Sequence, residues 1–259
     1  MKDFLKMTFA TLVGLMLFTV VSTVFSFILL GAIAAIGSTQ TKIANEGVLK
    51  IDMSTFVLTE QTQEADPFAM LTSGEEAPAQ VGIWDAIKAI NTAAEDPAVK
   101  FIYLLPDFAQ GGTAHIEEFR TALANFRNSG KAVVSYIESP TNAGYYLASV
   151  SDKIFMTPHD GTINMFNGLS SQMIFLKDIL DRLGVNVQLI RHGKYKSAGE
   201  MFVRNSSSKE NLEQNTEMVK SIWGAWSEDI ALSRGITADI LNSTIDNLKL
   251  NSSEDWVEA

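Results

Sequence analysis

A long uncharged apolar run near the N-terminus constrains this chain more than any other feature. No charged residue occurs between Lys6 and Lys42, and residues 9–36 are dominated by Leu, Val, Phe, Ile and Ala. About 20 apolar residues are enough for a helix to cross a bilayer, so this run predicts one transmembrane helix with room for tilt. A cleavable secretory signal is the alternative. Its apolar core spans only about 7 to 15 residues, so an uncleaved anchor is favoured.

The charges that flank this helix predict its orientation. Lys2 and Lys6 precede it, and a weakly charged stretch rich in Ser and Thr follows it. Because positive charge is retained on the cytoplasmic side, everything after Lys42 is expected outside the cytoplasm. In a bacterium this is the periplasmic or extracytoplasmic side of the inner membrane. We therefore expect a cytoplasmic N-terminus and anchor over residues 1–42, and a soluble domain over residues 43–259.

Composition limits what the soluble domain can be. The chain has 259 residues, of which 46% are hydrophobic, so it can bury a core and is not predominantly disordered. A net charge of −10, with no basic stripe, argues against nucleic-acid binding. The chain contains no cysteine and three histidines, so we expect neither a metal site nor a cofactor.

Strand and helix patterns alternate along the soluble part. Helices of this length between strands are typical of parallel pairing through helical crossovers, so an α/β domain is predicted. Residues 56–58 are expected to extend the first strand or pair with it, and residues 59–80 form a surface loop. Strands are predicted at residues 48–53, 100–105, 132–137, 154–157 and 185–190, and helices near residues 83–95, 116–126, 145–150 and 173–183 and through the last third to residue 235.

A glycine pair marks the first place where chemistry could occur. Gly111 and Gly112 lie between the strand at residues 100–105 and the helix that contains Ile116. Backbone N–H groups in such a turn can converge on a developing oxyanion, because no side chain blocks their approach. A plain turn between a strand and a helix is the alternative, and spacing alone favours it.

A lysine-rich segment marks the second place. Residues 191–198 follow the predicted strand at 185–190 and lead into the helical last third. Lys196 is the candidate general base, since burial and neighbouring cations lower the pKa of a lysine amine towards neutrality. A solvated surface loop is the alternative reading. We find no nucleophile elbow, phosphate-binding loop or zinc-protease motif.

These residues resemble the signal peptide peptidase (SppA, protease IV) family, and specifically the N-terminal half of its long duplicated form. The resemblance rests on the N-terminal anchor, on residues 142–149 (Asn-Ala-Gly-Tyr-Tyr-Leu-Ala-Ser) followed by Asp152-Lys153-Ile154, and on residues 195–198 (Tyr-Lys-Ser-Ala) with Glu200 shortly after. It covers nearly the whole chain. It implies a crotonase/ClpP-like spiral of parallel strands and helices.

The resemblance also implies a serine peptidase that uses a Ser/Lys pair. In the duplicated family the lysine comes from the first repeat and the serine from the second, and Lys196 matches that lysine. Asn142 stands where the catalytic repeat has its serine, so this position is degenerate. Gly111 and Gly112 resemble the oxyanion turn of the serine-bearing repeat in structure. The oxyanion function itself belongs to that other repeat. The chain ends in mid-repeat by comparison, and residues 1–259 alone are expected to be inactive.

The implied function is a membrane-anchored serine endopeptidase that degrades remnant signal peptides and other apolar peptides. The implied partners are those peptides, the bacterial inner membrane, and further copies of the chain in a ring, with contacts around Trp223 and Trp226. A non-catalytic scaffold or regulatory subunit of the same fold is the alternative. An acyl-CoA enzyme that uses the glycine turn is less consistent with a transmembrane anchor, since its cofactor is not expected outside the cytoplasm.

Overall fold

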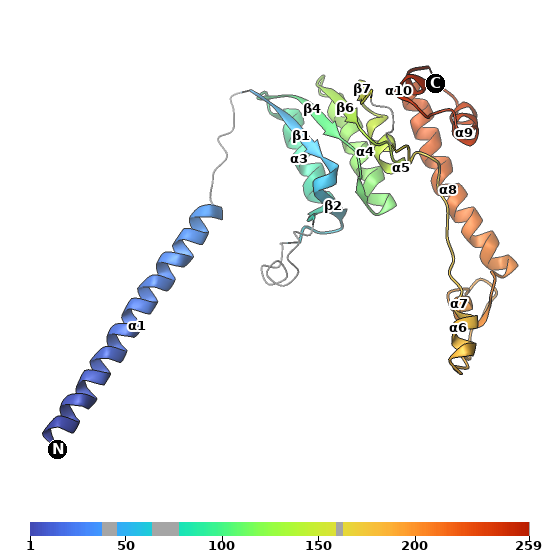
Figure 1. The fold of residues 1–259 in the computed structure, drawn as a ribbon. Coiled ribbons are helices and arrows are strands. Elements are labelled where there is room, and N and C mark those ends of the chain that lie inside the picture. Colours follow the sequence, from blue (N-terminus) through green and yellow to red (C-terminus); the bar gives the residue numbers. More distant parts are fainter. Residues whose placement is uncertain (38–45, 64–77, 159–162, 259) are drawn as a thin grey trace. The chain divides into compact units, whose positions relative to one another are not determined.

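The computed structural model describes residues 1–37, 46–63, 78–158 and 163–258 (Figure 1). The chain divides into two units, Met1–Asn45 and Glu46–Ala259. In the first unit, α1 (Lys2–Gly37) is one continuous helix, as predicted. Its span Lys2–Leu29 has the length and composition needed to cross a membrane. Thr11 and Thr19 donate their hydroxyls to the main-chain oxygens four residues earlier, which satisfies these polar groups within the helix.

Two parallel sheets form the framework of the second unit. The four-stranded sheet has the order β1 (Gly47–Asp52), β4 (Val99–Leu105), β6 (Ala132–Ile137), β7 (Lys153–Met156). The three-stranded sheet has the order β3 (Ala79–Gly82), β2 (Phe56–Thr59), β5 (Gln110–Gly111). Every pairing between these strands is parallel. The predicted α/β class is therefore confirmed.

Residues 56–58 form a strand in the second sheet and do not pair with β1, so that expectation was wrong. The short 3-10 helix η1 (Met53–Thr55) separates the two strands. The Asp52 carboxylate accepts hydrogen bonds from the main-chain nitrogen and the hydroxyl of Ser54, and the buried side chain of Met53 fixes the turn in the core. The chain therefore changes direction at residue 53 and leaves the first sheet.

Amphipathic helices follow the strands. They are α3 (Ile83–Glu95), α4 (Thr113–Arg127) and α5 (Asn142–Ala148). On α4 the predicted apolar face is confirmed, because each of its members is at most 2% exposed: Ile116, Phe119, Leu123 and Phe126. Burying side chains of this size contributes about 1.5–3 kcal/mol each. Gly130, at φ 82°, allows the chain to reverse after α4 and enter β6.

The last third of the chain is helical, as predicted. It contains α8 (Lys209–Arg234), α9 (Ala238–Asp246) and α10 (Ser253–Glu258). Trp226 of α8 stacks on Tyr146 of α5, with ring centroids 4.5 Å apart and planes 6° apart. Trp223 donates its indole N–H to Asn242 Oδ1 at 2.8 Å. Both tryptophans therefore make contacts inside the unit, and the expected contacts between copies around them stay a prediction.

The segment between the sheet and α8 departs from two expectations. A helix was predicted at residues 173–183, but only α6 (Lys177–Arg182) forms. Leu176 donates its N–H to Met201 O at 2.7 Å, and the Met173 sulfur accepts from the Ser207 hydroxyl at 3.0 Å, so residues 173–176 stay non-helical. Residues 185–190 were predicted as a strand. They are irregular because no neighbouring strand among the described residues pairs with them.

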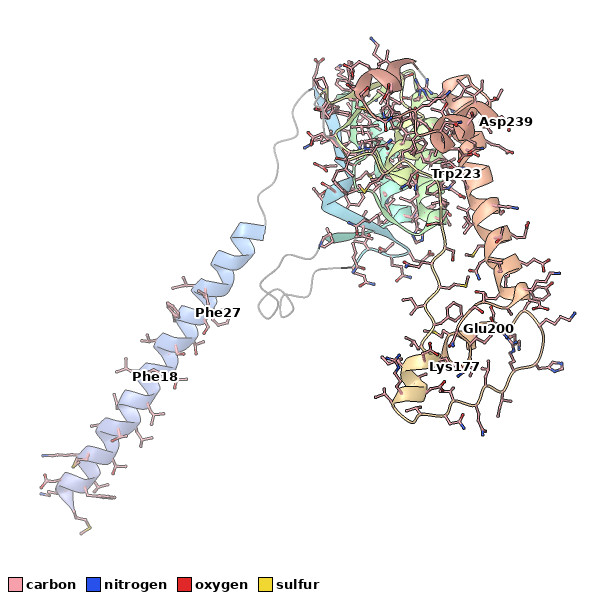
Figure 2. All side chains as sticks on the ribbon, turned by 45° about the vertical axis from the view of Figure 1, so that its right-hand side comes forward. Phe18, Phe27, Lys177, Glu200, Trp223 and Asp239 are labelled. Carbon is pink, nitrogen blue, oxygen red and sulfur yellow. The ribbon has the colours of Figure 1, made fainter. Side chains whose placement is uncertain are left out.

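This segment gathers at the N-terminal end of α8. Figure 1 shows α6 and α7 (Glu200–Val203) beside that end, with α5 and α9 near the opposite end. In Figure 2, Lys177 and Glu200 lie together near the start of α8, and Trp223 lies further along the same helix. The residues singled out by the sequence are thus distributed over two regions of one unit.

Candidate functional site

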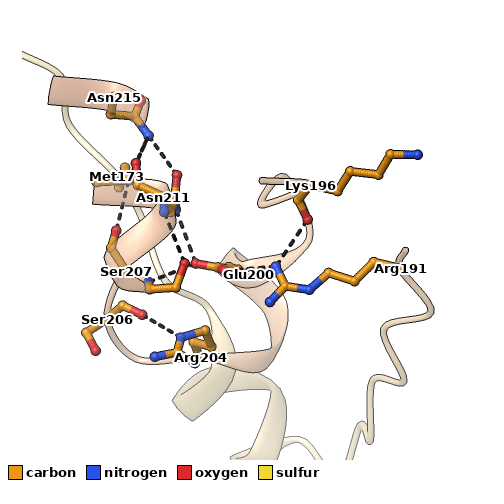
Figure 3. Close-up of polar contacts among 10 residues, drawn as sticks. Met173, Arg191, Lys196, Glu200, Arg204, Ser206, Ser207, Asn211 and Asn215 are labelled. Atoms are coloured by element: carbon orange, nitrogen blue, oxygen red, sulfur yellow. Dashed lines mark hydrogen bonds and ion pairs between the residues drawn. The ribbon is translucent and has the colours of Figure 1, made fainter. Parts of the chain in front are cut away.

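Residues 191–199, which we term the lysine loop, carry Lys196 and lead directly into α7. Lys196 is exposed, so the burial expected of a general-base lysine is not found in the described chain, and its amine points away from Glu200 and Arg191 (Figure 3). Gly193 has φ 101°, a conformation that side-chain-bearing residues rarely adopt, so glycine is required where the loop reverses. The Lys196 amine is thus free of Arg191 and Glu200 and accessible from solvent.

The carboxylate of Glu200 lies beneath the lysine loop. Glu200 is 1% exposed, and its oxygens accept hydrogen bonds from Arg191 Nη1 at 2.9 Å, Ser208 N at 3.0 Å and Asn211 Nδ2 at 3.3 Å. Burial alone would raise the pKa of Glu200. The hydrogen bonds from Ser208, Arg191 and Asn211 outweigh it and lower the pKa to about 2. The carboxylate is therefore ionised at neutral pH.

An apolar groove of about 530 Å³ adjoins the lysine loop. Ser197 and Ala198 line one side of it, so the groove begins at the residue after Lys196. Its apolar lining includes Met173, Ile174, Phe175, Met201 and Met218. Flexible methionine side chains adapt to varied apolar partners, so this lining suits apolar side chains of more than one shape.

The glycine pair lies in the second sheet and at the start of α4. Gly111 belongs to β5 and pairs with Leu58 of β2. A Cβ at Gly111 would lie 3.0 Å from Leu58 Cβ and 3.1 Å from Leu58 O, which is too close for ordinary contact. Gly112 caps α4, and its oxygen accepts the Ile116 N–H at 3.1 Å. Close packing against Leu58 thus favours glycine at residue 111.

Asn142 begins α5, and its side chain is fully engaged. Its Nδ2 donates to Gly168 O at 2.8 Å, and its Oδ1 accepts the N–H groups of Asn167 and Gly168, both at 3.1 Å. A carboxamide is not a nucleophile, and here it holds the loop at residues 167–168 against the start of α5. This position therefore has a structural use.

Two of the three candidate positions follow strands whose carboxyl ends lie at one edge of the first sheet. The glycine turn follows β4 and Asn142 follows β6, and parallel strands have their carboxyl ends at the same edge. A Cβ at Gly144 would lie 2.8 Å from Pro106 O, so the start of α5 packs against the loop that leads to the glycines. No hydrogen bond or ion pair within the described ranges joins the lysine loop to either position.

Arg191 and Glu200 are the polar residues at this site that pattern reasoning missed. Glu200 contributed only to the family resemblance, and Arg191 carried no assignment. The sequence feature that could have indicated them is their spacing around Lys196, since Arg191 lies five residues before it and Glu200 four residues after it. Among the residues that the structure describes, no group of three or more His, Cys, Asp or Glu side chains could hold a metal ion.

Comparisons with known proteins find a peptidase family model and relatives named as proteases. Residues 125–250 match the model of peptidase family S49. The chain is 28% identical over 207 residues to Protease 4 of Haemophilus influenzae, covering 78% of this chain and 33% of that protein. It is 34% identical over 143 residues to the chloroplastic serine protease SPPA of Arabidopsis thaliana, covering 55% of this chain and 21% of that protein.

A third relative agrees with these two. Over 156 residues the chain is 30% identical to Protease 4 of Salmonella typhi, covering 60% of this chain and 25% of that protein. The chain therefore spans a third or less of the length of these three relatives. The matched S49 region contains Asn142, Lys196, Arg191 and Glu200, whereas the glycine pair precedes it.

Proposed function

Because this chain is an SppA-type protein with a peptidase family S49 region at residues 125–250, we propose that it supplies the general-base lysine of a serine endopeptidase of the Ser/Lys type. Lys196 is that base. The nucleophilic serine is supplied by a second repeat outside residues 1–259, since Asn142 occupies the corresponding position in this one. Residues 43–259 form the first peptidase repeat.

The observation that carries this proposal is the presentation of Lys196. Its amine is exposed on a loop whose main chain is tied to the ion pair between Arg191 and the buried carboxylate of Glu200, and an apolar groove begins at the next residue. A loop of this kind holds the Lys196 amine beside a surface suited to apolar peptide. These features, together with the S49 match, support a base that acts on an incoming serine.

In the proposed reaction, the Lys196 amine removes the proton from the serine hydroxyl as the serine oxygen attacks the peptide carbonyl. The resulting ammonium returns that proton to the leaving amine when the carbon–nitrogen bond breaks, which leaves an ester between the peptide and the serine. Water then attacks this ester with Lys196 again as base, and the carboxylic acid product and the free serine are released. The cycle needs no metal or cofactor.

We place the reaction at a membrane surface. The span Lys2–Leu29 is suited to crossing a bilayer, and Lys2 and Lys6 favour a cytoplasmic N-terminus. In this arrangement residues 1–42 anchor the chain in a bacterial inner membrane, and the peptidase repeat lies on the periplasmic side. Remnant signal peptides and other apolar peptides are the proposed substrates, because they are left beside the bilayer.

Assembly into a ring of identical copies is a further part of the proposal. Large apolar side chains remain exposed between α6 and α7, including Leu183 at 71% and Ile190 at 96%. Exposed apolar surface of this kind is typical of protein contacts. Sedimentation of the full natural reading frame in detergent tests this part, and a purely monomeric species would exclude it.

A serine-directed fluorophosphonate probe tests the enzyme assignment. Applied to the full natural reading frame, it is expected to label one serine that maps outside residues 1–259, and Lys196→Met should abolish the labelling. Lys194→Met is the matched control, since Lys194 lies in the same loop, and it should label normally. Absence of labelling in the native protein would instead favour a non-catalytic scaffold, which the asparagine at residue 142 makes the second candidate.

A further inference from the structure

Glu200 is the only acidic side chain among the buried residues of the described chain. An ionised carboxylate removed from water costs several kcal/mol unless other groups compensate for the lost hydration. At 1% exposure, Glu200 must therefore obtain its compensation from protein groups. The surrounding contacts identify what this buried charge holds in place.

One carboxylate oxygen of Glu200 is fixed by the start of α8. Glu200 Oε2 accepts the Ser208 N–H at 3.0 Å and the Asn211 side-chain amide at 3.3 Å. Ser208 is the N-cap of α8, and its hydroxyl accepts the Asn211 N–H at 3.1 Å. The first N–H groups of a helix lack partners within the helix and favour negative charge, so this end of α8 is a stable anchor for the carboxylate.

The other oxygen of Glu200 orients Arg191. Arg191 Nη1 lies 2.9 Å from Glu200 Oε1, and the same nitrogen donates to the main-chain oxygen of Lys196 at 3.1 Å (Figure 3). The Glu200 N–H also donates to Ser197 O at 2.9 Å. The main chain on both sides of the Lys196–Ser197 peptide bond is therefore tied to Glu200, once through Arg191 and once directly.

We propose that Arg191 and Glu200 are a positioning pair that fixes the main chain of Lys196 relative to α8. The pair touches neither the substrate nor the reacting atoms, and this inference rests on the proposed role of Lys196 as general base. Its effect is to confine the lysine amine to one region, so that the serine meets a base already in place. Displacement of a catalytic group by about 1 Å can lower a rate by about 100-fold.

The arrangement of charges supports positioning in preference to direct proton transfer. Arg191 and Glu200 form an ion pair whose charges sum to zero, so Glu200 adds no net negative charge beside the lysine. Figure 3 shows the Lys196 amine directed away from the pair, whereas its main-chain oxygen faces Arg191. The link therefore runs through the backbone of Lys196.

Steady-state kinetics of Arg191→Met and Glu200→Gln in the full natural reading frame test the pair. Each change is expected to lower kcat about 10- to 100-fold for hydrolysis of an apolar peptide, with KM within about twofold of the native value. The double variant should lose no more than about the larger single loss, because the two residues act as one unit. Additive losses, or losses in KM alone, would overturn the inference.

Two further variants separate positioning from folding. Arg191→Lys keeps the charge, but its side chain is one bond shorter and its amine does not reach the position of Nη1, so kcat should remain about 10-fold low or lower while the thermal midpoint stays native. Arg204→Met is the matched control, since Arg204 follows α7 and donates to Ser206 O at 3.0 Å without contacting the lysine loop. It should leave kcat within about twofold. An equal loss in Arg204→Met would overturn the positioning role.

Failure of this inference is distinguishable from failure of the proposed function. If Lys196→Met abolishes hydrolysis and Arg191→Met has native kcat, Lys196 is the base and the pair is not needed. If Lys196→Met retains hydrolysis, the proposed function itself fails.

Discussion

Asn142 holds Gly168 from both sides, because its Nδ2 donates to Gly168 O at 2.8 Å and its Oδ1 accepts the Gly168 N–H at 3.1 Å. This clamp joins the start of α5 to a loop 26 residues further along the chain. Gly168 has φ 83°, so the loop turns sharply where it is held. A serine at residue 142 would be too short to make both contacts.

A serine introduced at residue 142 should therefore not produce peptidase activity. In the polypeptide 1–259, Asn142→Ser is expected to lower the free energy of unfolding by about 1–3 kcal/mol, since it leaves polar groups of the loop without partners. It should also remain unlabelled by a fluorophosphonate probe. Asn128→Ser, at the exposed end of α4, is the control and should change stability by less than about 0.5 kcal/mol. Labelling at residue 142 would show that this position can still act as a nucleophile.

The buried carboxylate of Glu200 predicts an acid-sensitive segment. Its pKa is about 2, below the ordinary 4.5. The ionised carboxylate therefore stabilises the fold at pH values above about 4.5. This contribution is lost as the pH falls from about 4.5 through about 2. Amide hydrogen exchange at α7 and at the start of α8 should accelerate across this range in the native chain. The difference in exchange rate between the native and Glu200→Gln proteins should shrink as the pH falls. A difference that stays constant with pH would contradict a stabilising role of the Glu200 carboxylate.

The close approach of α5 to the loop after β4 predicts a strict requirement for glycine. A Cβ at Gly144 would lie 2.8 Å from Pro106 O and 2.8 Å from Thr141 Oγ1, so Gly144→Ala should destabilise the fold by about 1–3 kcal/mol. Gly224 of α8 is the matched control, because nothing lies within 4 Å of its added Cβ. Gly224→Ala should stabilise by about 0.5–1 kcal/mol, as removal of glycine from a helix interior does. Thermal unfolding of both variants measures these effects, and equal midpoints would exclude the steric account.

The proposed membrane orientation predicts which residues can be reached from outside. The chain has no cysteine, so a single introduced thiol reports only its own position. Asp239→Cys, at an exposed position of α9, should react with a membrane-impermeant maleimide on bacterial cells whose outer membrane has been permeabilised. Asp3→Cys should react only after the inner membrane is opened. The reverse pattern would place the peptidase repeat in the cytoplasm.

Patterns within single elements were sufficient to predict the parallel framework. Strand β6 has the predicted bounds, residues 132–137, and the apolar face of α4 is buried at the expected positions. These elements are determined by their own periodicity and by nearby turn residues such as Gly130. The pattern could not show that β2 joins a second sheet, because that depends on partners distant in sequence, at residues 79–82 and 110–111.

The region around Lys196 was the least accessible to pattern reasoning. Residues 185–190 alternate like a strand but have no strand partner among the described residues, and apolar pattern alone does not supply one. Met173 lies in a helical pattern, yet its sulfur accepts hydrogen bonds from Ser207 and from Asn211 at 3.5 Å. The pairing of Arg191 with Glu200 depends on the folded loop, so their roles became visible only with its geometry.

Steady-state hydrolysis of an apolar peptide by Lys196→Met and Lys194→Met variants of the full natural reading frame tests the central claim most directly. Loss of a general base that also activates the nucleophile is expected to lower kcat by at least about 1000-fold in Lys196→Met. Lys194→Met should keep kcat within about twofold, since Lys194 has no assigned role in the reaction. Native turnover by Lys196→Met would contradict the assignment of Lys196 as the base.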